Sequence, residues 1–360
     1  LDLLIGRALR LARLRDQTER SPYEEIERVV EAELGAPLAE LFADFSREPM
    51  ASASVGQVHR ATLRDGRAVA VKVQHPGIER AMESDLRNAQ LVERMATSLV
   101  PAGFQVDRTF QEVAERFREE LDYRLEAANQ RRFQALHAAV PEVRIPAVMS
   151  DFCSRRVLTT ELVEGRRLEE MLASCGESER AGYAATLWSF VFRSLLVGGE
   201  LNADPHPGNY LFGPMPTIAF LDFGCVQRLS APRLNAARAL HRAAVAGLSA
   251  QFEDAVRELL STRGGAYERF ALGFTRRAFA PLFESPFHMS ADYLRGLVNY
   301  SVEHKLELLK DRRHATAFPA ELALLNRLQF GFYSLLSKLD VTVDYAALQR
   351  GILAELEGAR

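Results

Sequence analysis

The order of strand-forming and helix-forming segments most constrains how this chain can fold. Two short apolar segments, residues 55–63 and 68–73, are separated by Asp65-Gly66, a dipeptide typical of tight hairpin turns. From Leu168 onward nearly every segment has helical periodicity, apart from a short strand, turn and strand near residues 208–222. Strands followed by helices predict an α+β fold, with a small sheet-bearing N-lobe and a larger, mostly helical C-lobe.

Helical segments are expected before and after the hairpin. In the N-terminal region, Ser21 should act as the N-cap of a helix, with Pro22 at its first position, Glu24 in a capping box and Gly35 at its end. Further expectations are two helices and a later strand pair, over residues 77–98, 107–137 and 143–162. The predicted organisation is an N-terminal helical extension, a sheet-bearing lobe and a helical lobe, over residues 1–45, 46–164 and 165–360.

Composition narrows the possible functions. Of the 360 residues, 48% are hydrophobic and 26% charged, as expected for a globular protein with a sizeable core. A net charge of −3 and a pI near 6.3 argue against nucleic-acid binding. The three cysteines lack metal-ligand spacing, and no apolar run reaches the length of a membrane span. We therefore expect a cytoplasmic protein, or one attached peripherally to the inner face of the membrane.

Lys72 stands out because it is the only lysine in the first 300 residues. It follows Ala70-Val71 in the second hairpin strand, from which an ammonium can reach the α- and β-phosphates of a nucleotide. Glu126, in a segment predicted to be helical, could pair with Lys72 and hold it in place. Each residue alone has an ordinary interpretation, as an edge-strand lysine or as part of a helix with a Glu120–Arg124 charge pair.

Two further motifs follow in a fixed order. Asp204 and Asn209 are five positions apart in a rigid segment with two prolines and a glycine, the spacing of a kinase catalytic loop. Asp204 would face the reacting hydroxyl or water, and Asn209 would offer an oxygen ligand to Mg²⁺. Asp222 follows an apolar strand, begins an Asp-Phe-Gly turn and would bind Mg²⁺ bridging the phosphates. Together the motifs predict a kinase-like site for Mg-ATP.

Residues 157–165 lie between these motifs and have the character of a hinge. This segment begins as a β-prone strand and ends at a glycine. The backbone groups of Glu161 and Val163 would bond the edge of the adenine. Without the surrounding motifs the segment would be only a strand end.

From about residue 20 to about residue 235, the chain resembles the UbiB/ADCK family of atypical protein-kinase-like proteins. The resemblance is carried by residues 49–61 (PMASASVGQVHRA), 69–77 (VAVKVQHPG), 120–126 (ELDYRLE) and 203–209 (ADPHPGN). The family has an Ala-rich loop where ordinary kinases have a Gly-rich one. By this resemblance the phosphate-binding loop consists of Ala51, Ser52, Ala53, Ser54 and Val55. Glu120 and Asp122 match the family's E-x-D motif, and kinase-like roles pass to Lys72, Glu126, Asp204, Asn209 and Asp222.

The resemblance implies ATP and Mg²⁺ as cofactors, ATPase activity, and support for biosynthesis of ubiquinone or related isoprenoid quinones. The implied partners are quinone-biosynthesis proteins and membrane lipids. Asn202 departs from the family, which often has histidine there, and Ser52 replaces an alanine. No lysine precedes Lys72, so the family's K-x-G-Q motif either lies before Leu1 or has been lost. The short span from Gly224 to the next helix leaves little room to recognise a peptide.

Two other functions fit part of the pattern. A small-molecule phosphotransferase of the aminoglycoside or choline kinase type shares the order of Asp204, Asn209 and Asp222, but residues 51–57 favour UbiB/ADCK. A non-catalytic, ATP-gated adaptor would use the same nucleotide site without turnover. The intact Asp204 favours an enzyme over this adaptor.

Overall fold

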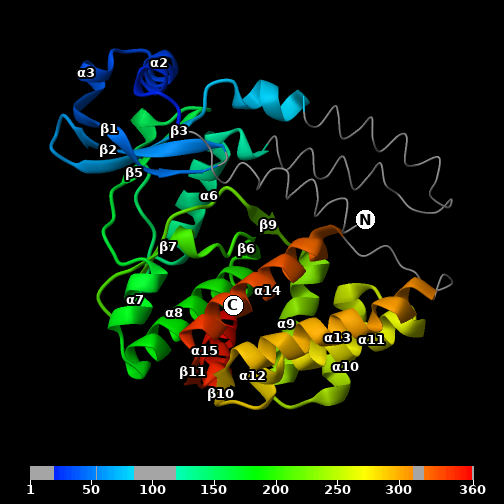
Figure 1. Cartoon of the computed structure of the whole chain (residues 1–360). Helices are drawn as coiled ribbons and strands as arrows, with labels where there is room; N and C mark the ends of the chain where they lie inside the picture. Colours follow the sequence, from blue (N-terminus) through cyan, green and yellow to red (C-terminus); the bar gives the residue numbers. More distant parts are fainter. Residues whose placement is uncertain (1–19, 54, 85–118, 311–319, 359–360) are drawn as a thin grey trace. The chain divides into compact units, whose positions relative to one another are not determined.

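The computed structural model describes residues 20–53, 55–84, 119–310 and 320–358 (Figure 1). The chain divides into two compact units. The sheet unit comprises residues 1–132, 146–163 and 223–225, and the helical unit comprises residues 133–145, 164–222 and 226–360. A sheet-bearing unit and a mostly helical unit confirm the predicted α+β fold. Among the described helices, none is both long and apolar enough to cross a membrane.

A four-stranded antiparallel sheet in the order β1-β2-β3-β5 forms the sheet unit. Its strands are β1 (Phe42–Ser52), β2 (Gly56–Leu63), β3 (Ala68–Gln74) and β5 (Val157–Glu161). The predicted hairpin of β2 and β3 is confirmed, and Gly66 in its turn has φ of 89°. Glycine adopts this conformation without a steric penalty, which explains its place in the turn.

The core of the sheet unit lies between the sheet and α2 (Tyr23–Leu34), with α3 (Leu38–Leu41) beside it (Figure 1). Ile26 and Val30 of α2 are fully buried in the cluster that contains Val69 and Val71 of β3. α2 ends at Gly35, as predicted, with φ of 76°. Because side chains alternate along a strand, Ala70, Lys72 and Gln74 lie on the opposite face of β3.

The start of α2 differs from the prediction. Pro22 occupies the N-cap position, and no side chain caps the helix. The hydroxyl of Ser21 instead bonds Nδ1 of His75 at 2.8 Å, so the predicted capping box of Ser21 and Glu24 is wrong. The expectation of helix to residue 45 also missed the beginning of β1. The helices expected in residues 1–19 and 85–118 lie outside the described residues.

The helical unit is organised around α8, which contributes ten buried residues. Trp188 of α8 contacts the ring of Tyr345, with the two centroids 4.4 Å apart, and its Nε1 donates to Gln349 Oε1 at 3.1 Å. The described helices of this unit are α7 (Leu168–Ser174), α8 (Glu177–Leu196), α9 (Ala231–Val245), α10 (Ser249–Leu260), α11 (Gly265–Ala278), α12 (Ala280–Phe283), α13 (Ala291–Lys310), α14 (Ala320–Leu339) and α15 (Tyr345–Gly358).

Short strands frame the segment that contains the predicted catalytic loop. β7 (Tyr210–Phe212) and β8 (Ile218–Phe220) form the expected hairpin within residues 208–222. β6 (Glu200–Asn202) pairs with β9 (Val226–Arg228), and β10 (Phe287–Met289) pairs with β11 (Val341–Val343). The strands of the last two pairs, β6–β9 and β10–β11, were not predicted. Three residues carry too little periodicity to distinguish a strand from a helix.

The strand pair expected over residues 143–162 is confirmed only in part. An antiparallel bridge joins Val148 to Thr160, and the N–H of Met149 donates to the Thr159 carbonyl at 2.9 Å. The two regular strands of this span, however, belong to different sheets. β4 (Val143–Arg144) pairs in parallel with β8, whereas β5 pairs with β3. Between them lies a short 3-10 helix at Ser150–Phe152. The main ladder partner of each strand therefore lies far away in the sequence, which local pattern does not reveal.

We expect Gly56→Ala to destabilise the sheet unit by about 1–3 kcal/mol, the usual cost of overpacking. A Cβ on Gly56 would lie 2.3 Å from the carbonyl oxygen of Val73, and neither strand can move without breaking the β2–β3 register. The matched control is Gly351→Ala, where nothing lies within 4 Å of the new Cβ. That change should stabilise the interior of α15 by up to about 1 kcal/mol. Thermal melting of both variants tests this, and equal shifts would contradict it.

Candidate active site

Lys72 and Glu126 form the predicted ion pair. Lys72 Nζ donates to Oε1 and Oε2 of Glu126 at 2.8 and 2.9 Å. Glu126 lies in the first turn of α6 (Tyr123–Leu136), and its side chain is only 5% exposed, against 23% for Lys72. The ammonium also lies 5.0 Å from the centroid of the Tyr123 ring. These contacts hold the only charged nitrogen on β3 in one place, as a phosphate-binding lysine requires.

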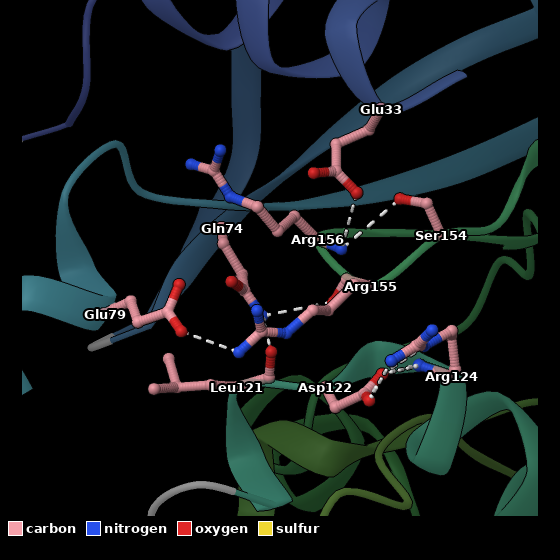
Figure 2. Close-up of polar contacts among 9 residues, drawn as sticks. All are labelled: Glu33, Gln74, Glu79, Leu121, Asp122, Arg124, Ser154, Arg155 and Arg156. Carbon is pink, nitrogen blue, oxygen red and sulfur yellow. Dashed lines mark hydrogen bonds and ion pairs between the residues drawn. The ribbon is translucent and has the colours of Figure 1, made fainter. Parts of the chain in front are cut away.

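The E-x-D motif is divided between two elements. Glu120 is exposed in a helical turn that ends before α6 begins, so the predicted continuous helix through residues 120–126 is wrong. Asp122 is the residue before α6, and its Oδ1 accepts from the backbone N–H of Arg124 at 3.0 Å. The Arg124 guanidinium also binds both carboxylate oxygens (Figure 2). Asp122 therefore caps α6, and Arg124 pairs with it rather than with Glu120.

The Ala-rich loop is an extension of two strands. Ala51 and Ser52 end β1 and pair with Val58 and Gln57 of β2. The backbone N–H of Ala53 donates to the Gly56 carbonyl at 2.8 Å, which closes the turn. Ser54 lies outside the described residues. The proposed phosphate-binding role of this loop stays a prediction, but its backbone conformation is now defined on both sides of Ser54.

His75 holds this loop, a role that was missed from the sequence. Its backbone N–H donates to the Val55 carbonyl at 2.9 Å, and its Nε2 donates to the Ala53 carbonyl at 3.1 Å. Because Nε2 carries the proton, Nδ1 can accept from the hydroxyl of Ser21. The available signal was the position of His75, three residues after Lys72.

The hinge residues Glu161 and Val163 end the sheet unit. The backbone N–H of Glu161 donates to the Ala147 carbonyl at 2.8 Å, so it is already used by the protein. The N–H of Leu162 is likewise bonded to the Ala68 carbonyl at 3.1 Å. In contrast, no backbone hydrogen bond of Val163 occurs among the described residues. The adenine-binding role of Glu161 and Val163 stays a prediction, and it requires the backbone of Val163 or the carbonyl of Glu161.

Asp204 and Asn209 meet in the helical unit. Asn209 Nδ2 donates to Asp204 Oδ2 at 3.0 Å and to the Asp204 carbonyl at 3.3 Å. A 3-10 turn, Pro207–Asn209, returns the chain toward Asp204, and His206 caps it by accepting from the Gly208 N–H. The five-residue spacing therefore brings the two side chains together, as the motif predicted.

Asn202 links this loop to Asp222. Its Oδ1 accepts from the N–H of Asp204 at 3.2 Å, and its Nδ2 donates to the Asp222 carbonyl at 2.6 Å. Burial, reinforced by the negative charges of Asp204 and Asp222, raises the pKa of Tyr210. Both carboxylates therefore act on the same tyrosine. Asn202 therefore connects the predicted catalytic loop to the backbone of Asp222.

The donor set suits Mg²⁺ that arrives with a nucleotide. Asn209 uses Nδ2 for its side-chain hydrogen bonds, which leaves Oδ1 as a hard oxygen donor, and Asp222 adds a carboxylate. No group of three or more His, Cys, Asp or Glu side chains in the described part of the chain could hold a metal ion. Mg²⁺ commonly binds through one or two protein oxygens plus phosphate oxygens and water, so the residues fit this ion.

Comparison with known proteins decides the family. The model of the ABC1 atypical kinase-like domain matches residues 13–248. The chain belongs to this family. Its resemblance to UbiB/ADCK proteins and its kinase-like fold are thereby confirmed. In Saccharomyces cerevisiae, the mitochondrial atypical kinase COQ8 is 26% identical over 360 residues, covering 96% of this chain and 69% of COQ8.

Other relatives match only in part or by structure. The chloroplastic protein Activity of BC1 Complex Kinase 3 of Arabidopsis thaliana is 41% identical over 217 residues, which cover 59% of this chain. The match covers only 30% of that plant protein. A solved complex of Rv3197 with erythromycin, from Mycobacterium tuberculosis, has a TM-score of 0.74 and 27% identity, covering 98% of this chain and 88% of Rv3197.

We expect Asp122→Ala to cost about 1 kcal/mol of stability, because α6 loses its N-cap. Asp122→Asn keeps an oxygen that can accept from the Arg124 N–H and should cost less. Urea denaturation of both variants at pH 7 measures this. An alanine variant as stable as the native protein would contradict the capping role.

The charge of Asp122 should also make a pH-dependent contribution. Its hydrogen bond from the Arg124 side chain lowers the pKa of Asp122 in the folded protein. The charge therefore stabilises the fold above the unfolded-state pKa of about 3.9, and this contribution is lost as the pH falls through the folded-state pKa. The stability difference between the native protein and Asp122→Asn should accordingly narrow below about pH 4.

Proposed function

We propose that this protein binds Mg-ATP and transfers or hydrolyses its terminal phosphoryl group, with a small molecule or lipid as the acceptor. The observation that carries the proposal is the two-point bond between Lys72 and the buried carboxylate of Glu126. An ammonium held in this way is pre-organised to bind phosphate oxygens, and phosphoryl transfer depends mainly on such positioning and charge stabilisation.

Each remaining site residue has a defined task in this proposal. The Ala-rich loop covers the phosphates, and the backbone of Val163 binds the adenine edge. Asp204 orients the attacking hydroxyl or water and accepts its proton, while the Asn209 amide holds that carboxylate in place. Asn209 Oδ1 and Asp222 would hold Mg²⁺, which supplies positive charge to neutralise the phosphates when bound. Glu120, exposed ahead of α6, would act only at the edge of the site.

The biological role is proposed from the family. Support for ubiquinone or another isoprenoid-lipid pathway, at the surface of a membrane, fits the resemblance to UbiB/ADCK proteins and to COQ8. Only five residues separate Cys225 from α9, and three of them form β9, so this connection offers little surface for a peptide. A screen for the acceptor should therefore use isoprenoid phenols and lipid vesicles, with erythromycin added because Rv3197 is seen with it.

Mg-ATP should raise the melting temperature of the native protein, and metal-free ATP should raise it much less. At about 100 times its dissociation constant, a ligand stabilises the folded state by about 2.7 kcal/mol. Asp222→Asn should abolish the Mg-dependent part, because it weakens the metal-binding carboxylate. Differential scanning fluorimetry with Mg-ATP, Mg-ADP and metal-free ATP measures this. An Asp222→Asn variant that binds Mg-ATP at full strength would overturn the site.

Asp204→Asn should separate catalysis from binding. The amide has nearly the same shape but cannot accept the proton of the attacking group, so turnover should fall at least about 100-fold. Mg-ATP binding, measured by the same melting assay, should remain within a few-fold of native. Equal and low phosphate release by the native protein and Asp204→Asn, with intact binding, would instead favour the non-catalytic adaptor.

A further inference from the structure

Lys72 and Gln74 lie on the same face of β3, because side chains two residues apart in a strand point the same way. Lys72 reaches Glu126 in the first turn of α6. Gln74 reaches the carbonyl of Leu121, just before α6 begins, and its Nε2 donates there at 2.9 Å (Figure 2). One strand therefore contacts the beginning of α6 at two separate points.

A second carbonyl strengthens the attachment at Gln74. Its Nε2 also lies 3.4 Å from the Arg155 carbonyl, which accepts from the backbone N–H of Tyr123 at 2.9 Å. Gln74 is only 2% exposed, so water has little access to its amide. Losing these acceptors would therefore leave a buried donor unsatisfied, which is costly. The first residue of α6 and the end of β3 thus share one acceptor.

The segment that presents this carbonyl is itself anchored. The Arg155 side chain binds Glu79 at 2.7 Å, and the N–H of Arg156 lies 3.3 Å from both Glu33 Oε2 and Ser154 Oγ (Figure 2). The carbonyl of Arg156 accepts from the N–H of Gln74 at 3.1 Å. The acceptors around Gln74 therefore belong to a fixed part of the sheet unit.

We propose that Gln74 is a positioning residue for Lys72, because it fixes the start of α6 so that Glu126 meets the lysine. This inference rests on the proposed function, in which Lys72 binds phosphate. Tyr123 and Gln130 also hold α6, through the carbonyls of Arg155 and Pro146, but neither bond reaches β3. Attachment to β3 both at Leu121, through Gln74, and at Glu126, through Lys72, fixes the start of the helix against that strand. The ion pair then forms without a separate activation step that moves α6.

The amide of Gln74 is required for chemical reasons. Both partners of Nε2 are carbonyl oxygens, which accept and never donate, so the side chain must be a donor. Methionine matches glutamine in length but cannot donate. Gln74→Met therefore removes the attachment while it largely fills the same space.

Gln130 supplies a matched control on the same helix. It is fully buried, and its Nε2 donates to the Pro146 carbonyl at 2.7 Å. Gln130→Met thus removes the same kind of buried bond, but one that does not connect α6 to β3. Both variants should lose similar stability. If the role of Gln74 were purely structural, the Lys72 amine would therefore be equally reactive in both variants.

The test measures the reactivity of Lys72 toward an amine-acylating reagent, acetyl N-hydroxysuccinimide, followed by peptide mass spectrometry. The chain has only four lysines, and Lys338 serves as the internal reference. Only an unpaired, unprotonated amine reacts, so loss of the Glu126 contact accelerates labelling. In Gln74→Met, labelling of Lys72 should rise about five-fold relative to Lys338, the factor for one lost hydrogen bond of about 1 kcal/mol.

The same labelling in Gln130→Met should equal that of the native protein. Native-like labelling in Gln74→Met, or an equal rise in both variants, overturns the proposal. If Gln74→Met does not fold, Gln74→Asn, which shortens the amide by one methylene, is judged by the same criteria.

Mg-ATP tests the proposed function separately, in the native protein. Bound phosphates should protect Lys72 from the reagent, and absence of protection would contradict the nucleotide site. The comparison between Gln74 and Gln130 variants uses no nucleotide. Failure of the proposed function and failure of the positioning role are therefore distinguishable.

Discussion

The ion pair between Lys72 and Glu126 depends on how β3 divides its side chains between two faces. Val69, Val71 and Val73 are fully buried with α2, which holds the strand rigidly in the sheet. The residues between them, Ala70 and Lys72, lie on the opposite face of the sheet, where Lys72 reaches Glu126. A nearly buried carboxylate such as Glu126 is costly to desolvate, so a well-aligned ammonium is needed to offset that cost. The hydrophobic core thus fixes the position of Lys72, and the charge of Lys72 offsets the cost of burying Glu126.

In the helical unit the predicted site residues lie on short irregular segments, so a long strand or helix does not hold them in place. Two pairs of short strands, β6–β9 and β7–β8, bracket the loop on both sides. Beyond the ends of these strands, side-chain amides supply the hydrogen bonds that hold the loop. Asn202 joins the backbone of Asp204 to that of Asp222, and Asn209 holds the Asp204 carboxylate. An amide can donate and accept at once, so Asn202 orders both segments, whereas a carboxylate there would repel the carbonyl of Asp222.

Much of this arrangement could be predicted from the sequence, where spacing alone determines contact. The β2–β3 hairpin follows from Asp65-Gly66, the end of α2 from Gly35, and the Asp204–Asn209 contact from their spacing. Side chains with competing partners could not be predicted. Ser21 resembles an N-cap but bonds His75, which lies far away in the sequence. Asp122 matches an active-site motif, yet it caps α6 because the helix begins one residue later. The strand pair expected over residues 143–162 exists only as the Val148–Thr160 bridge, because the main ladders of β4 and β5 are with the remote strands β8 and β3.

The Ala-rich loop gains its shape from hydrogen bonds rather than from glycine. A Gly-rich loop lets backbone N–H groups approach phosphates closely, since glycine has no side chain and few conformational limits. Here Ala51 and Ala53 carry methyl groups where a Gly-rich loop has none, and His75 ties Ala53 and Val55 to the end of β3. In the proposed function, such a loop would adapt less to the phosphates, and more of their charge would be met by Lys72 and Mg²⁺. The short connection from Cys225 to α9 would then favour water or a small molecule over a peptide as the acceptor in the proposed function.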